Sequence, residues 1–151
     1  MRINLRERLR AMLALTDPPH KIALAFAIGA FIGMSPFIGA HTIVALLIAW
    51  VFRLNKLASI IGAYISNPWT MVPILTLDYW IGKKLLGITK RLPKINWYSI
   101  DLTTLFEHFK TLFLPTFVGS IILGILVSIA SYPLIYRAVV KYRSIRKHEQ
   151  G

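Results

Sequence analysis

The sequence predicts an all-α fold, and more specifically a small polytopic integral membrane protein with two broken helices. Hydrophobic residues make up 56% of its 151 residues, whereas a soluble domain is typically about 45–50% apolar. Three runs, residues 22–52, 57–77 and 111–136, contain no Asp, Glu, Lys or Arg. Each is at least as long as the roughly 20 apolar residues that cross a bilayer core.

The distribution of charge supports the same fold class. The formal net charge is +12, and the cations lie at the ends of the uncharged runs, where they orient helices and contact anionic lipid headgroups. This placement predicts a multi-pass protein of a bacterial inner membrane and not a nucleic-acid-binding surface. The first apolar run is also too long for the core of a cleavable signal peptide.

The first 19 residues are expected to form an amphipathic helix. Apolar residues Leu5, Leu9, Met12 and Leu13 share one face, and most of the arginines lie on the other. Such a helix lies in the membrane interface or packs on the protein's own loops. The sequence leaves both alternatives open.

The next two segments, residues 22–52 and 57–82, resemble each other and predict an internal duplication. Ile28 to Ile32 (Ile-Gly-Ala-Phe-Ile) recurs as Ile61 to Ile65 (Ile-Gly-Ala-Tyr-Ile). Small residues recur at the same four-residue spacing in both copies: Ala25, Gly29 and Gly33, then Ala58, Gly62 and Ser66. Each copy then reaches a proline and a second apolar stretch.

The prolines predict a break in each repeat. Pro36 and Pro68 suit the first position of a second half-helix, with Ser35 and Asn67 as its caps. A half-helix of about 12 residues is roughly 18 Å long, about half the bilayer core. Each repeat is therefore a re-entrant hairpin or a discontinuous crossing, and the positive-inside tendency slightly favours hairpins.

The remaining chain predicts a linker at residues 93–96, an interfacial helix at 100–113, a transmembrane helix at 115–136 and a basic tail at 137–151. Ser120, Gly124 and Ser128 form a small-residue stripe on the transmembrane helix. Such stripes allow close helix packing in lipid. We therefore expect a homo-oligomer with this stripe at its interface.

Several motifs resemble a bacterial membrane family, domain-of-unknown-function family 2062. They are Gly33-Met34-Ser35-Pro36 with Gly39, Arg53-Leu54-Asn55-Lys56, and Ser66-Asn67-Pro68-Trp69-Thr70 with Pro73. The resemblance covers about residues 8–142. It implies no assigned activity and no catalytic residues, and it implies an association of some relatives with glycosyltransferases.

Two half-helix N-termini at mid-membrane depth would attract an anion. The candidate substrate-binding residues are those of the two breaks together with the one carboxylate near them: Ser35, Pro36, His41, Thr42, Asn67, Pro68, Trp69, Thr70 and Asp78. Capping of a structural kink explains Ser35 and Asn67 equally well. Trp69 either lines a site or fills space beside the break. Asp78 is a proton-coupling group, a counter-ion to Arg53, or an ordinary interfacial ion-pair partner.

The sequence contains no enzyme, metal or cofactor motif, so we expect neither catalysis nor a cofactor. The leading hypothesis is a transporter-like protein that binds or moves an anionic solute or a phosphorylated lipid carrier. The alternative is a membrane scaffold that anchors a partner such as an envelope glycosyltransferase. A polar cavity at membrane depth would favour the transporter, and a break region without one would favour the scaffold.

Overall fold

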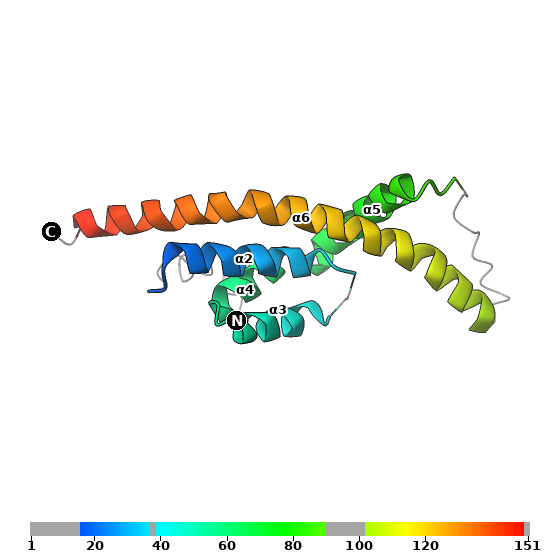
Figure 1. Ribbon diagram of the computed structural model, residues 1–151, viewed down its shortest axis with the longest axis horizontal. Helices are drawn as coiled ribbons and strands as arrows, with labels where there is room; N and C mark the ends of the chain where they lie inside the picture. Colours follow the sequence, from blue (N-terminus) through cyan, green and yellow to red (C-terminus); the bar gives the residue numbers. More distant parts are fainter. Residues whose placement is uncertain (1–15, 37–38, 90–101, 150–151) are drawn as a thin grey trace.

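The computed structural model describes residues 16–36, 39–89 and 102–149, and these residues form α-helices with no strand among them. The all-α prediction is therefore confirmed for the described chain. The predicted N-terminal helix falls almost entirely outside it, as does the linker at 93–96. The helices are α2 (Pro19–Gly33), α3 (His41–Val51), α4 (Lys56–Ala63), α5 (Pro68–Leu85) and α6 (Leu102–Glu149) (Figure 1).

Helices α2 and α4 pack against each other through the small residues of the two repeats. A Cβ atom on Gly29 would lie 2.0 Å from the Ser59 carbonyl oxygen and 3.1 Å from the Ala63 nitrogen. A Cβ atom on Gly62 would lie 2.2 Å from the Phe26 carbonyl oxygen and 2.9 Å from the Ala30 nitrogen. These two contacts are reciprocal under the 33-residue offset of the repeats, so the packing follows the duplication seen in the sequence.

Both helices end where the prolines predict a break. Helix α2 ends at Gly33 and α4 ends at Ala63. A Cβ atom on Gly33 would lie 2.7 Å from the Ala63 carbonyl oxygen, so the two helix ends touch. The breaks therefore lie side by side at one end of the α2–α4 pair.

The predicted role of Ser35 and Pro36 is wrong. Helix α3 begins at His41, and its N-cap residue, Ala40, makes no side-chain cap. Ser35 instead donates from Oγ to the Ile32 carbonyl oxygen at 2.6 Å. The same carbonyl also accepts from the Ser35 backbone nitrogen at 3.0 Å, so Ser35 helps to satisfy the end of α2, where up to four carbonyls need partners. The first break is thus longer than the pattern around Pro36 predicted.

After the breaks, the two repeats take different paths. Helix α3 folds back alongside α2 and α4, whereas α5 leads away from α4 toward the opposite end of the molecule (Figure 1). Ser59 holds α3 by donating from Oγ to the Ala45 carbonyl oxygen at 3.1 Å. Helix α5 packs on α6 instead: a Cβ atom on Gly82 would lie 1.7 Å from the Pro115 carbonyl oxygen. The sequence predicts one arrangement for both repeats, whereas in the structure the second helix turns back in the first repeat and continues away in the second (Figure 1).

Helix α6 is continuous from Leu102 to Glu149, which corrects the expected division into an interfacial helix, a transmembrane helix and a tail. The sequence predicts a helix start at Pro115, because proline is tolerated in the first turn of a helix and usually breaks its interior. Within α6 it removes one backbone donor, and the neighbouring Thr116 bonds from Oγ1 to the Leu112 carbonyl oxygen at 2.7 Å. Neighbouring helices and such hydroxyl bonds let a helix continue through proline.

The small-residue stripe of α6 has its partner within the same chain. A Cβ atom on Gly124 would lie 2.9 Å from the Phe31 ring of α2, and both Gly124 and Ser120 are buried. The sequence predicts a dimer interface at this stripe, because a chain this small offers few internal partners for three such stripes. That location is wrong for Ser120 and Gly124, and a homo-oligomer remains a prediction.

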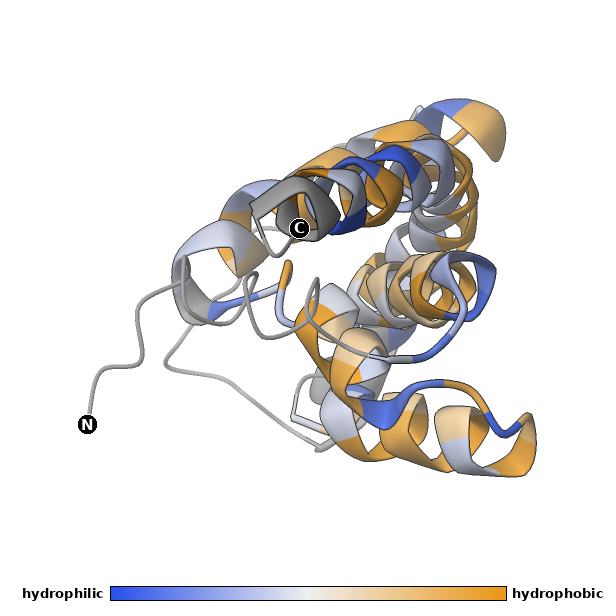
Figure 2. Cartoon of the chain, turned by 90° about the vertical axis from the view of Figure 1, so that its left-hand side faces the viewer, coloured by the Kyte–Doolittle hydropathy of each residue, from blue (hydrophilic) through white to orange (hydrophobic). Residues whose placement is uncertain are grey.

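The described chain buries small residues and exposes large apolar ones. On α3, Ala45 and Ala49 are fully buried, while the outer face is exposed: Ile43, Leu46, Leu47, Trp50 and Val51. Figure 2 shows this lowest helix coloured mainly as hydrophobic. The only described helix long and apolar enough to cross a membrane is α6, through residues Lys110–Ile145. Extensive exposed apolar surface marks a membrane or protein contact, so the fold indicates membrane association.

We predict that Gly29→Ala destabilises the fold by about 2–3 kcal/mol because the added methyl group overlaps the Ser59 carbonyl. Alanine is the better helix former by about 1 kcal/mol, so a loss can come only from the helix contact. Thermal unfolding in detergent measures the effect. Ala130→Leu, at an exposed position of α6, is the control. Equal melting temperatures for Gly29→Ala and the native protein would contradict the close contact.

Candidate functional site

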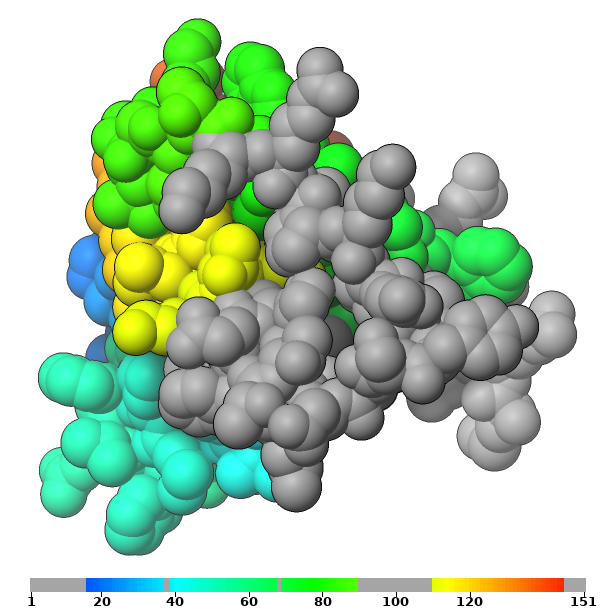
Figure 3. Space-filling model, turned by 90° about the vertical axis from the view of Figure 1, so that its right-hand side faces the viewer, coloured from blue at the N-terminus to red at the C-terminus, as the bar shows by residue number. Residues whose placement is uncertain are grey.

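Three regions of the described chain contain a buried polar side chain or a cavity. They are the breaks, the contact of α5 with α6, and the turn between α3 and α4. Their order along α6 fixes their relative positions. Asp17 accepts a bond from Arg143 at one end of α6, Phe31 meets Gly124 in the middle, and Gly82 meets Pro115 toward the other end. Figure 3 shows the 110–125 part of α6 between α5 and α3. The breaks therefore lie near the middle of the uncharged run of α6.

Asn67 caps α5 as the sequence predicted, with Pro68 at the first helical position. Its Oδ1 accepts from the Trp69 nitrogen at 3.0 Å and the Thr70 nitrogen at 3.1 Å. Thr70 returns the bond, its Oγ1 accepting from the Asn67 nitrogen at 2.9 Å and donating to the Ile65 carbonyl oxygen at 2.7 Å. This capping box explains Asn67 and Thr70 as structural residues. The cap leaves the Asn67 amide nitrogen outside it.

The break region contains an apolar cavity of about 350 Å³ between α2, α3 and α6. Its two polar lining residues are Ser35 and Ser120, and each hydroxyl donates to the backbone carbonyl three residues earlier in the chain. The other lining residues are apolar: Phe31, Ile32, Val44, Ile48, Phe117 and Ile121. This cavity suits a hydrocarbon chain better than a charged solute.

The other predicted site residues are dispersed. His41 and Thr42 are half-buried at the start of α3, and Pro36 is half-buried in the turn after α2. Trp69 has 91% of its surface exposed, so it neither lines a cavity nor fills the break. Its place beside Pro68 suggested an inward position, but the first turn of α5 points it outward.

Asp78 lies away from both breaks, where α5 meets α6. It is fully buried, and a Cβ atom on Gly119 of α6 would lie 1.8 Å from its carbonyl oxygen. It is not a counter-ion to Arg53, because Arg53 lies in the α3–α4 turn at the Asp17 end of α6. Nor is it an exposed interfacial pair: Lys84 instead lies over the Trp80 ring at 5.4 Å.

The turn between α3 and α4 has an unusual backbone. The Leu54 nitrogen donates to the Ala49 carbonyl oxygen at 2.8 Å, and the Arg53 nitrogen donates to the Trp50 carbonyl oxygen at 3.2 Å. This is a Schellman motif, in which glycine is the usual residue at the left-handed position. Here Arg53 occupies it, with φ +52°. The left-handed conformation costs a side-chain-bearing residue about 1–2 kcal/mol, and such strain concentrates at functional sites.

Hydrogen bonds tie this turn to the rest of the fold. Asn55 caps α4 by accepting at Oδ1 from the Ala58 nitrogen at 2.9 Å, while its amide donates to the Asp17 carboxylate. The Asp17 carbonyl in turn accepts from Arg143 of α6. A second contact joins the same ends, His20 Nδ1 lying 2.6 Å from the Tyr132 hydroxyl. The turn is therefore held rigidly between the start of α2 and the end of α6.

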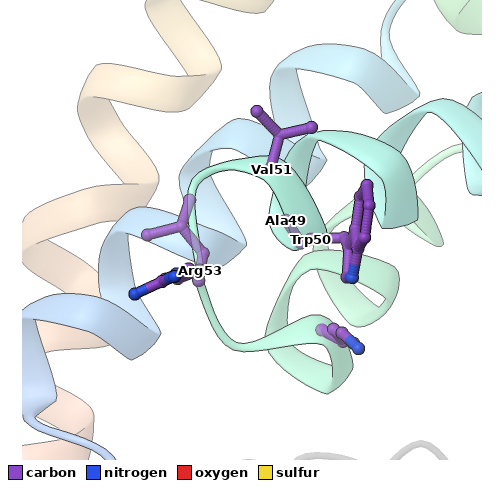
Figure 4. Close-up of a pocket in the computed structure, with 6 residues that line it drawn as sticks. Ala49, Trp50, Val51 and Arg53 are labelled. Carbon is purple, nitrogen blue, oxygen red and sulfur yellow. The ribbon is translucent and has the colours of Figure 1, made fainter.

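An open cleft of about 570 Å³ adjoins the turn (Figure 4). It is lined by Ala49, Trp50, Val51 and Leu54 together with two exposed cations, Arg53 and Lys56. Sequence reasoning treated these cations as orientation signals and missed the cleft. The signal available was the Arg-Leu-Asn-Lys motif, which begins three residues after Trp50, but neither the left-handed conformation of Arg53 nor the cleft can be predicted from it.

The chain belongs to domain-of-unknown-function family 2062, described as an uncharacterized protein conserved in bacteria, and the match covers residues 2–148. The resemblance seen in the motifs is therefore confirmed over nearly the whole chain. No curated protein and no solved structure matches it.

We predict that Asn67→Ala lowers stability by about 1 kcal/mol, because the α5 cap is lost, whereas Asn67→Asp keeps it. Denaturant or thermal unfolding in detergent measures both variants. Equal destabilisation by both substitutions would show that the amide nitrogen, and not the cap, is what the fold requires.

Proposed function

We propose that the protein is a multi-pass protein of the bacterial inner membrane that binds a lipid with a phosphate-bearing headgroup, as a phosphorylated lipid carrier has. The observation that supports this best is the end of α3. Its exposed apolar face leads directly into the cleft that carries Arg53 and Lys56. A lipid has matching groups in the same order, with an apolar hydrocarbon chain followed by a charged headgroup.

The residues of the cleft suit this ligand. Arg53 offers a planar fork of donors that matches phosphate oxygens, and Lys56 adds a compact positive charge. Trp50, 65% exposed beside them, is the residue type that favours the membrane–water interface. A phosphate ligand also accounts for an arginine at a left-handed position where glycine would be less strained.

The path of the chain supports a specific membrane placement. In this proposal α6 crosses the bilayer, α2 and α3 form a hairpin that enters and leaves on one side, and α4 with α5 forms a discontinuous crossing. This arrangement puts Lys21, Arg53, Lys56 and Arg143 on one side and Lys83 on the other. The positive-inside tendency then places the first side in the cytoplasm.

The apolar lining of the break cavity helps to distinguish a transporter of soluble anions from a lipid-binding or anchoring protein. Because the hydroxyls of Ser35 and Ser120 donate to backbone carbonyls, neither polar residue of the cavity has a free donor for a charged solute. This favours a lipid over a soluble anion as the ligand. It also suits the alternative that the protein anchors a partner enzyme, such as an envelope glycosyltransferase, beside that enzyme's lipid substrate.

The membrane placement predicts the sides from which single cysteines react. The native chain has no cysteine, so Thr16→Cys, Arg53→Cys, Thr89→Cys and Ser144→Cys can each be labelled alone with an impermeant maleimide in oriented vesicles. We expect Thr16→Cys, Arg53→Cys and Ser144→Cys to react from one side and Thr89→Cys from the other. Reaction of Thr89→Cys from the same side as Arg53→Cys would rule out a crossing by α4 and α5.

The lipid proposal predicts a loss of affinity when the cleft cations are removed. Two charges at a membrane surface contribute about 2 kcal/mol, so the double variant Arg53→Gln, Lys56→Gln should bind a phosphate-headgroup lipid about 30-fold more weakly. Native mass spectrometry with phosphatidic acid, and with zwitterionic phosphatidylcholine for comparison, measures this. The matched control is Lys84→Gln, Lys141→Gln, which removes two exposed cations elsewhere. Equal losses of lipid affinity in the two double variants would show that net charge, and not the cleft, determines binding.

A further inference from the structure

The contact between α5 and α6 encloses a carboxyl group with no partner. Asp78 is fully buried, and neither of its carboxylate oxygens has a hydrogen-bond partner among the residues that the structure describes. The helices touch backbone to backbone at Asp78 itself, which lies against Gly119, and one turn further along α5, where Gly82 lies against Pro115. The backbone of Asp78 therefore lies at one of the closest contacts between the two helices, and its carboxyl group is buried there.

No described group at this crossing can neutralise an ionised Asp78. On α6, Pro115 and the residues next to the two contact points, Thr116 and Ser120, carry no titratable group, and both hydroxyls donate to carbonyls of α6 itself. On α5 itself the titratable residues after Asp78 are Tyr79, Lys83 and Lys84, and none of them bonds to its carboxylate oxygens. An unpaired buried carboxylate is far more costly than its protonated form.

The crossing also lies within the apolar part of the protein. Gly119 follows Thr111 by eight residues in the uncharged run of α6, which at 1.5 Å per residue places it about 12 Å inside that run. An ionisable group at such a depth is a functional candidate by default. Two prolines, Pro73 in α5 and Pro115 in α6, each remove a backbone hydrogen bond near the crossing.

We infer that Asp78 is a proton-binding site whose occupancy controls the packing of α5 on α6. With the proton bound, the carboxyl group is neutral and the two backbones stay in contact. When the proton leaves, the carboxylate needs water or a cation, and the glycine contacts must open to admit it. The cleft at Arg53 plays no part in this step, so the inference stands apart from lipid binding.

The coupling has a defined direction. The closed crossing holds a proton that the open crossing releases, so raising the pH favours the open form. Because α5 continues the chain from the second break, opening at Asp78 would move the half-helix that Asn67 caps. A proton would thus control the discontinuous crossing of the second repeat.

Spin labels at Leu77→Cys and Leu114→Cys test the inference, since both positions are exposed beside the crossing and the chain has no other cysteine. We expect the label-to-label distance of the full-length protein in nanodiscs to lengthen between about pH 5 and about pH 9, a range wide enough to titrate a shifted carboxyl group. With Asp78→Asn, a neutral side chain of the same shape, the distance should stay short throughout. Asp78→Ser provides a smaller neutral side chain if the asparagine variant folds poorly.

The outcomes separate clearly. A distance that does not change with pH in the protein with native Asp78 would overturn the inference. The same pH-dependent change in both the native-Asp78 protein and the Asp78→Asn variant would also overturn it, because another group would then be titrating. A change confined to the protein with Asp78 supports it.

Discussion

Contact between helix backbones through glycine is the constraint on which this fold depends. Gly29, Gly62, Gly82 and Gly119 each lie where a Cβ atom would fall within 2.2 Å of a carbonyl oxygen on a neighbouring helix. Lipid gives little hydrophobic driving force between helices, so close packing must supply the attraction. The first two glycines join the repeats to each other, and the last two join the second repeat to α6.

This way of packing determines where the large side chains go. Because the helix contact faces are lined mainly by glycine, alanine and serine, many of the bulky residues of α3, α5 and α6 lie outside. Because its small residues face inward, α3 presents its large apolar residues at the surface, as a ridge that ends at Arg53 and Lys56. The proposed lipid site therefore follows from the way α3 packs: its alanine face is buried, and its larger apolar residues lie outside.

The sequence predicted well the features that depend on a few neighbouring residues. The repeat, the interruptions near Pro36 and Pro68, and the Asn67 cap all follow from local spacing, and the structure contains the interruptions and the cap. The sequence predicted poorly the features in which contacts between helices override a local rule. Pro115 suggested a helix start, yet α6 runs through it, and the Gly124 stripe suggested a dimer, yet Phe31 of the same chain covers it.

The sequence by itself determined that the described chain is helical, that its helices are apolar and broken in two places, and that small residues mark their contact faces. These properties follow from the order of residues along each helix. Only the tertiary structure decided that α3 turns back while α5 continues, that Arg53 adopts a left-handed conformation beside a cleft, and that Asp78 is enclosed at a helix crossing. Each of these depends on which two faces meet, and similar stripes on several helices allow more than one pairing until the packed backbones select one.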